Sequence, residues 1–180
     1  MSLQIAFLTG RSQPGNTSLS PEQHAFMAGL GKNTEGIAVN FPWIAQGEAW
    51  QATPLLRASI NNARDYLGSR RPAFVGAYQA GALALLASAD HTLLLCGSCG
   101  LELFNNLQLP ASVMPRVSIF AFGPVARRRP ACRHLLVQGR QDWISRLWFR
   151  DVDEYIACGH MNYLSQPELT DRCTRFIRTL

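Results

Sequence analysis

Short apolar runs recur along the chain and are separated by polar stretches rich in Gly and Pro. They cover residues 4–8, 36–41, 91–96, 117–122, 134–138 and 155–158. Runs of this length, bounded by turn residues, predict β-strands. The segments between and after them have helical spacing, and they predict helices at residues 21–30, 54–68, 73–88, 101–107 and 168–180. The first helix carries its own start signal, because Ser20 is followed by Pro21 and Gln23.

The order of these elements predicts an α/β fold. The strand segments are continuously apolar instead of alternating, as expected for parallel strands that helices cover on both faces. We therefore expect a three-layer sandwich with a mostly parallel central sheet of about six strands. At 180 residues the chain is long enough for one domain with a substantial core, so we expect residues 1–180 to form it.

Three residues with catalytic chemistry each follow a predicted strand. Ser98 lies in the segment LCGSCGL (residues 95–101), between a strand and a helix and among small residues. Asp142 follows the strand at 134–138, and His160 follows the strand at 155–158. Ligands of parallel sheets bind at the carboxyl ends of the strands, so we expect these three residues to converge at one edge.

A serine, a histidine and a carboxylate together can perform acyl transfer. His160 would remove the proton from the Ser98 hydroxyl, and Asp142 would orient and stabilise the imidazole. The backbone N–H of Cys99, at the start of the next helix, would face the substrate oxyanion. We expect a second oxyanion donor in the loop after the first strand, at Gly10 or Arg11.

These motifs resemble the α/β-hydrolase superfamily. Residues 95–101 are similar to the G-x-S-x-G nucleophile elbow, with Cys96 in place of the first Gly, and residues 7–10 resemble the oxyanion strand, with Thr9 where His is common. Residues 137–142 and 158–161 are similar to the acid and histidine loops. The sequence lacks the first two antiparallel strands of the family, and the lid is reduced to a loop at residues 123–133, as in its short, lidless esterases.

The resemblance implies a serine hydrolase that cleaves a carboxylic ester through an acyl-serine intermediate, with no cofactor or metal. The same residues would serve an acyl thioesterase. A binding protein without activity is another alternative, because residues 75–81 also have an elbow-like shape with Tyr78 at the nucleophile position. Cys96 and Cys99 form a C-x-x-C pair, which leaves a redox or zinc role open.

Composition limits the partners. The net charge of +5 is mostly dispersed, and we see no nucleic-acid-binding motif. The cluster Arg127, Arg128 and Arg129 would attract an anionic group, for example an acidic acyl carrier protein. Trp43 and Trp143 each follow a strand, where they would line an acyl pocket. An odd number of cysteines, five, and the lack of a signal-peptide pattern or a long apolar run favour a cytoplasmic protein without a membrane span.

Overall fold

The computed structural model describes residues 2–31, 35–45 and 47–180, which fold around one six-stranded sheet. The strand order is β2-β1-β3-β4-β5-β6, and every neighbouring pair is parallel. The strands are β1 (Leu3–Leu8), β2 (Glu35–Gly36), β3 (His91–Gly97), β4 (Val117–Phe122), β5 (Arg133–Gly139) and β6 (Glu154–Ile156). The predicted parallel sheet is confirmed.

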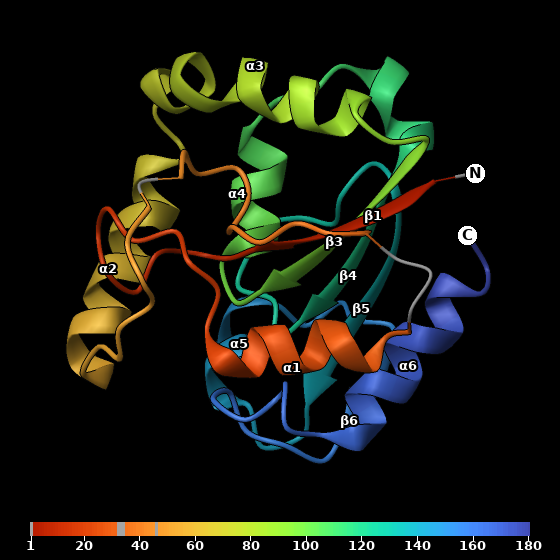
Figure 1. The fold of residues 1–180 in the computed structure, drawn as a ribbon. Coiled ribbons are helices and arrows are strands. Elements are labelled where there is room, and N and C mark those ends of the chain that lie inside the picture. Colours follow the sequence, from red (N-terminus) through yellow and green to blue (C-terminus); the bar gives the residue numbers. More distant parts are fainter. Residues whose placement is uncertain (1, 32–34, 46) are drawn as a thin grey trace.

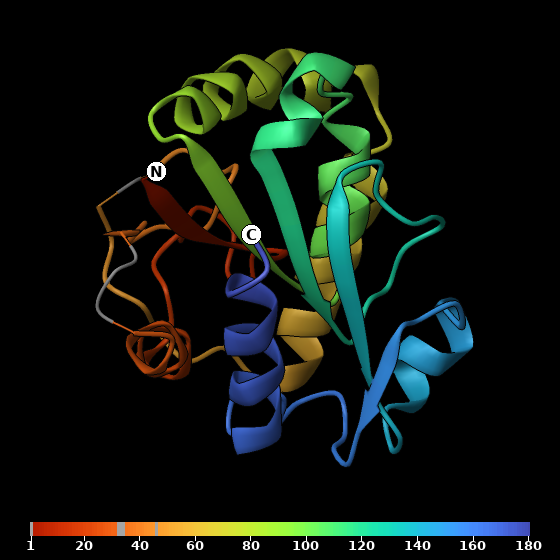
Figure 2. The same cartoon turned by 90° about the vertical axis from the view of Figure 1, so that its right-hand side faces the viewer.

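Helices cover both faces of this sheet. They are α1 (Pro21–Gly29), α2 (Leu55–Gly68), α3 (Pro72–Ala87), α4 (Gly100–Asn106), α5 (Trp143–Trp148) and α6 (Pro167–Ile177), with a 3-10 helix, η1, at Ala111–Arg116. Helices α1 and α6 lie on one side of the sheet, and α3 and α4 lie on the other (Figures 1 and 2). The capping box predicted at Ser20 is present at the start of α1.

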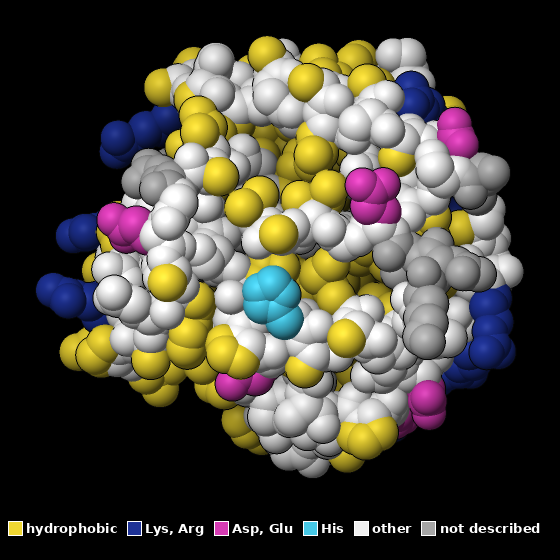
Figure 3. Space-filling view, in the orientation of Figure 1, with side chains coloured by type: hydrophobic (Ala, Val, Ile, Leu, Met, Phe, Trp, Pro, Cys, Tyr) yellow, Lys and Arg dark blue, Asp and Glu magenta, His cyan; other side chains and the backbone are white. Residues whose placement is uncertain are grey.

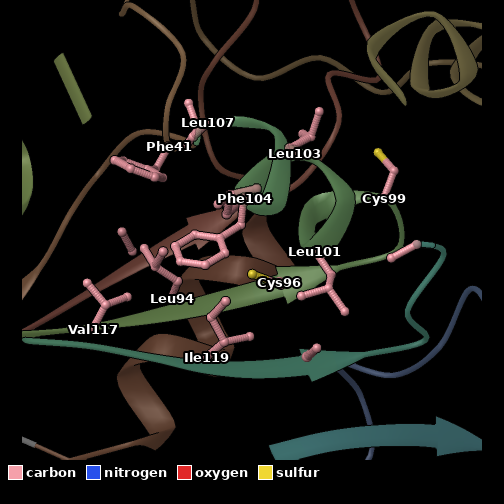
Figure 4. Close-up of a cluster of buried hydrophobic side chains, with 14 of the residues drawn as sticks. Phe41, Leu94, Cys96, Cys99, Leu101, Leu103, Phe104, Leu107, Val117 and Ile119 are labelled. Atoms are coloured by element: carbon pink, nitrogen blue, oxygen red, sulfur yellow. The ribbon is translucent and has the colours of Figure 1, made fainter. Parts of the chain in front are cut away.

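Alternate residues of the central strands enter two separate cores. Leu94 and Cys96 of β3 pack with α4, whereas Leu93 and Leu95 pack toward α1 and α6. Figure 4 shows the first core, with Phe104 of α4 lying over β3 and β4. All four of these β3 side chains are fully buried, which explains why the strand reads as a continuous apolar run.

The second strand is shorter than the sequence predicts. An expected strand at 36–41 is reduced to Glu35–Gly36 plus single backbone hydrogen bonds, from Ile37 to Ile5 and from Phe41 to Phe7. Between these points the chain turns toward another partner, because the Asn40 N–H donates to the Thr17 carbonyl. The Asn40 side chain also bonds to Thr9, so this segment holds the loop after β1 in place.

Residues 123–132 join β4 to β5 as an irregular loop. The sequence predicts a loop in place of a lid at this position. Among the described residues, no helix combines the length and apolar character needed to cross a membrane.

Candidate active site

Ser98 lies at a sharp turn between β3 and α4. Its φ of +50° is in the left-handed region, which a residue other than Gly rarely adopts and which signals a strained turn. The turn is held by hydrogen bonds from the Ser98 N–H to the Phe122 carbonyl and from the Val125 N–H to the Ser98 carbonyl. A β-carbon at Gly100 would lie 1.9 Å from the Leu8 carbonyl oxygen, so the turn requires a residue without a side chain there.

Ser98, His160 and Asp142 form a continuous chain of hydrogen-bonding groups. The Ser98 Oγ lies 3.2 Å from His160 Nε2. On the other side of the ring, His160 Nδ1 lies 2.9 Å and 2.8 Å from the two Asp142 carboxylate oxygens. The three residues come from the ends of β3, β5 and β6, as the positions of the predicted strands led us to expect.

Further groups fix the Asp142 carboxylate. The Tyr163 hydroxyl donates to Asp142 Oδ2 at 2.6 Å and itself accepts the Gly139 N–H at 2.7 Å. The Ser145 N–H donates to Asp142 Oδ1 at 2.9 Å, which makes Asp142 the N-cap of α5. Burial of Asp142 opposes ionisation, but the hydrogen bonds from His160, Tyr163 and Ser145 outweigh it and hold the Asp142 pKa below its usual value.

No family model and no curated protein matches the sequence. Solved structures match the fold. A carboxylesterase from Mesorhizobium loti superposes with a TM-score of 0.59 at 15% identity, over 98% of this chain and 88% of the other. Esterase PE8 superposes with a TM-score of 0.58 at 17% identity, over 99% of this chain and 92% of the other.

The chain has the α/β-hydrolase fold.

The loop after β1 differs from expectation at Arg11. Its N–H, expected to face an oxyanion, donates instead to Asp65 Oδ2 at 2.6 Å, and its guanidinium pairs with Asp65 Oδ1 at 2.8 Å. The Arg11 guanidinium also lies 3.9 Å above the Trp43 ring. The Gly10 N–H faces the sulfur of Cys99, which is a weak hydrogen-bond acceptor. Asp65 was missed by the sequence reasoning because it lies within a helix, α2, far from the loop in sequence.

Trp43, which the sequence places at an acyl pocket, is a core residue in this α/β-hydrolase fold. Its side chain is buried, its indole N–H donates to the Thr9 carbonyl at 2.9 Å, and its ring packs on Tyr78. Tyr78 itself lies in the middle of α3, away from any strand end. The alternative elbow at residues 75–81 is therefore wrong, because the Ala- and Leu-rich helix begins before it, at Pro72.

The arginine cluster is largely neutralised within the fold. Arg127 pairs with the buried Glu102 at 2.7 Å, and Arg129 pairs with Asp151 at 3.0 Å and with Asp153. These contacts fasten the loop between β4 and β5 to its neighbours. Arg128 is exposed and donates to the Asn105 carbonyl. Trp143 is exposed and directly follows Asp142. It is the first residue of α5, the helix that also contains Arg146.

The C-x-x-C pair consists of free, buried thiols. Burial raises the pKa of Cys99 to about 12 and raises the pKa of Cys96 well above its usual value, so both thiols remain protonated near neutral pH. Within the described part of the chain, no group of three or more His, Cys, Asp or Glu side chains is placed to hold a metal ion.

Proposed function

We propose that this protein is a serine hydrolase that cleaves a carboxylic ester through an acyl-Ser98 intermediate. The observation that carries the proposal is the unbroken chain of hydrogen-bonding groups from the Ser98 hydroxyl through His160 to Asp142. A serine hydroxyl is a weak nucleophile until a base accepts its proton, and this arrangement supplies the base and its orienting carboxylate. Likeness to esterases of the same fold also supports an ester as the substrate.

The first half of the reaction forms the acyl-enzyme. Ser98 Oγ attacks the ester carbonyl carbon while its proton passes to His160 Nε2, and Asp142 stabilises the resulting imidazolium. The bond from the carbonyl carbon to the leaving oxygen then breaks, and His160 returns the proton to that oxygen, which leaves as an alcohol. The ionised state of Asp142, favoured by its low pKa, suits this role.

In the second half, water hydrolyses the acyl-enzyme. His160 takes a proton from the attacking water, the bond from the carbonyl carbon to Ser98 Oγ breaks, and the proton returns to Ser98 as the carboxylic acid leaves. We assign the oxyanion donors to the N–H groups of Cys99 and Gly10. The sulfur that the Gly10 N–H now faces is a weak acceptor, so an oxyanion can displace it.

The test is labelling with a fluorophosphonate probe, followed by mass mapping of the labelled peptide. We expect the label on Ser98, and we expect Ser98→Ala and His160→Ala to abolish it, whereas Ser165→Ala, which changes an exposed serine near His160, should not. No label on Ser98 in folded protein would reject the proposal in favour of a binding protein.

Comparing matched oxygen esters and thioesters then decides between an esterase and a thioesterase, which the same residues would serve. An acidic carrier protein stays a prediction for the acyl donor; because Arg127 and Arg129 are already paired with carboxylates, Arg128 is the residue of this cluster left to attract it.

A further inference from the structure

An ordinary surface helix buries its apolar face and exposes its polar face. Helix α2 does the reverse. Leu56, Ile60, Ala63 and Leu67 follow one another at intervals of four, three and four residues, which places them on one stripe. This stripe faces solvent, with Leu56 76% and Leu67 57% exposed. The residues that α2 buries are instead polar: Asn61 and Asp65.

Helix α5 presents a second exposed apolar surface. Trp143 is 72% exposed and Leu147 is 71% exposed, and Ile144 and Trp148 are also exposed. Ser145 is the residue that this helix buries. Rows of large apolar side chains in water are unfavourable for a protein that works alone, so an exposed patch of this kind marks a binding surface.

The two helices meet beside the proposed site. The Tyr66 ring of α2 contacts the Trp148 ring of α5, with 6.4 Å between their centroids. Helix α5 begins immediately after Asp142, and α2 supplies Asp65 to the loop that carries Gly10 and Arg11. We call the exposed apolar residues of these helices the α2–α5 face; they are Leu55, Leu56, Ile60, Ala63, Leu67, Trp143, Ile144, Leu147 and Trp148.

Unpaired positive charges border this face. Among the described residues, no carboxylate pairs with the arginines at its border, which are Arg57, Arg64, Arg140, Arg146 and Arg150. Figure 3 shows Lys and Arg side chains beside apolar side chains along its left margin, where α2 lies in Figure 1. A hollow of about 660 Å³ at α5 also combines positive charge with apolar surface, because Arg146, Arg150 and aromatic rings line it.

We propose that the α2–α5 face docks the protein on an anionic phospholipid surface. Exposed Trp and Leu side chains insert at the boundary between headgroups and acyl chains, and the arginines bind headgroup phosphates. A second copy of this chain fits the face less well, because pairing it with itself would oppose arginine to arginine. Given the proposed hydrolase function, the substrate is an amphiphilic ester that the lipid surface presents beside Ser98.

Vesicle sedimentation tests the docking directly. We expect the protein to bind phosphatidylcholine vesicles that contain about one third phosphatidylglycerol, and to bind pure phosphatidylcholine vesicles at least about tenfold more weakly. The double variants Leu56→Gln/Ile60→Gln and Arg146→Glu/Arg150→Glu should each weaken binding by about tenfold or more. The matched control Arg175→Glu/Arg178→Glu makes the same charge change in α6 and at its C-cap, across the sheet, and should keep most of the binding.

Several outcomes would overturn the docking proposal. One is wild-type protein that does not sediment with anionic vesicles; another is equal loss in the α6 control, which would mean that net charge alone drives binding. Analytical ultracentrifugation gives a third, because a dimer that Leu56→Gln/Ile60→Gln abolishes would identify a second copy as the occupant. Loss of vesicle binding in that variant with a monomer throughout supports the proposal.

Activity separates this inference from the proposed function. The docking variants should hydrolyse a short water-soluble ester and react with fluorophosphonate like wild type, but should cleave an ester embedded in anionic vesicles at least about tenfold more slowly. A wild type that reacts at Ser98 and ignores vesicles rejects only the docking. A wild type that binds vesicles but has no activated Ser98 rejects the proposed hydrolase function and the ester substrate. The docking proposal would still be supported.

Discussion

The Asp142 carboxylate has two tasks in the structure, since it accepts hydrogen bonds from the His160 ring and also caps α5. Asp142→Asn separates them, because Asn caps a helix as well as Asp but carries no charge. We expect kcat on a soluble ester to fall roughly 10³–10⁴-fold. Thermal unfolding of the same variant should show a folded protein. Activity within tenfold of wild type would remove Asp142 from the mechanism.

Tyr163 holds Asp142 in place through its hydroxyl, so we consider it a positioning residue. Tyr163→Phe removes the 2.6 Å bond to Asp142 and leaves the buried Gly139 N–H without its partner. We expect a loss of about 1–3 kcal/mol in the free energy of unfolding by urea. In kinetics we expect kcat to fall while KM stays constant, because the buried Tyr163 acts through Asp142.

The pH dependence of Tyr163→Phe distinguishes positioning from simple packing. A carboxylate whose folded pKa is depressed stabilises the protein above its unfolded pKa, and this contribution is lost as pH falls through the folded pKa. Tyr163 is one of the groups that depress the Asp142 pKa, so the variant should lose less additional stability than wild type between about pH 5 and pH 3. An identical acid-induced loss in both proteins would contradict this role.

At the scale of elements, the contact between α4 and β1 fixes the elbow. A β-carbon at Gly100 would collide with the Leu8 carbonyl oxygen, whereas one at Gly81, inside α3, would meet no atom within 4 Å. We expect Gly100→Ala to cost roughly 3 kcal/mol or more of unfolding free energy. Gly81→Ala should instead stabilise the protein by about 0.5–1 kcal/mol, since Ala favours a helix over Gly. Urea unfolding measures both; equal effects would show that α4 can shift away from β1.

The elements that the sequence predicts well are those that depend on local pattern. Strands β3 and β5, which precede Ser98 and Asp142, contribute buried residues to both cores, so their apolar runs were visible in the sequence. The strand before His160, β6, is short and only Ile156 of it is buried. The second strand was overestimated because Asn40 finds its partners in Thr9 and Thr17, and nothing in its own neighbourhood indicates those contacts.

Long-range partners account for the residues that sequence reasoning missed or misplaced. Asp65 and Tyr163 act through groups 54 and 21 residues away, and either reads as an ordinary helix or loop residue by itself. The inverted pattern of α2 has the same origin. Its period predicted a helix correctly, but burial of Asp65 toward Arg11 turned the apolar stripe outward.

At the scale of the whole molecule, the buried thiols limit stability in alkali. All five cysteines are free and buried, and burial raises each thiol pKa, to about 12 for Cys99 and Cys132 and to about 11 for Cys158. In the unfolded chain a thiol titrates near pH 8.5. A group whose folded pKa is raised stabilises the protein fully below its unfolded pKa and loses that contribution as pH rises toward the folded pKa.

We therefore expect stability to be constant from about pH 7 to pH 8 and to decline steeply above about pH 8.5. Each thiol that ionises only in the unfolded chain adds to this loss, so the decline should steepen with every pH unit above 8.5. Urea unfolding midpoints under reducing conditions, measured from pH 6 to pH 10, test this. Cys173→Ala, in α6 and far from Ser98, should lower the whole curve but make its alkaline decline shallower. A midpoint that stays constant up to pH 10 would mean that these thiols ionise within the folded protein, and that the core beneath the elbow admits water.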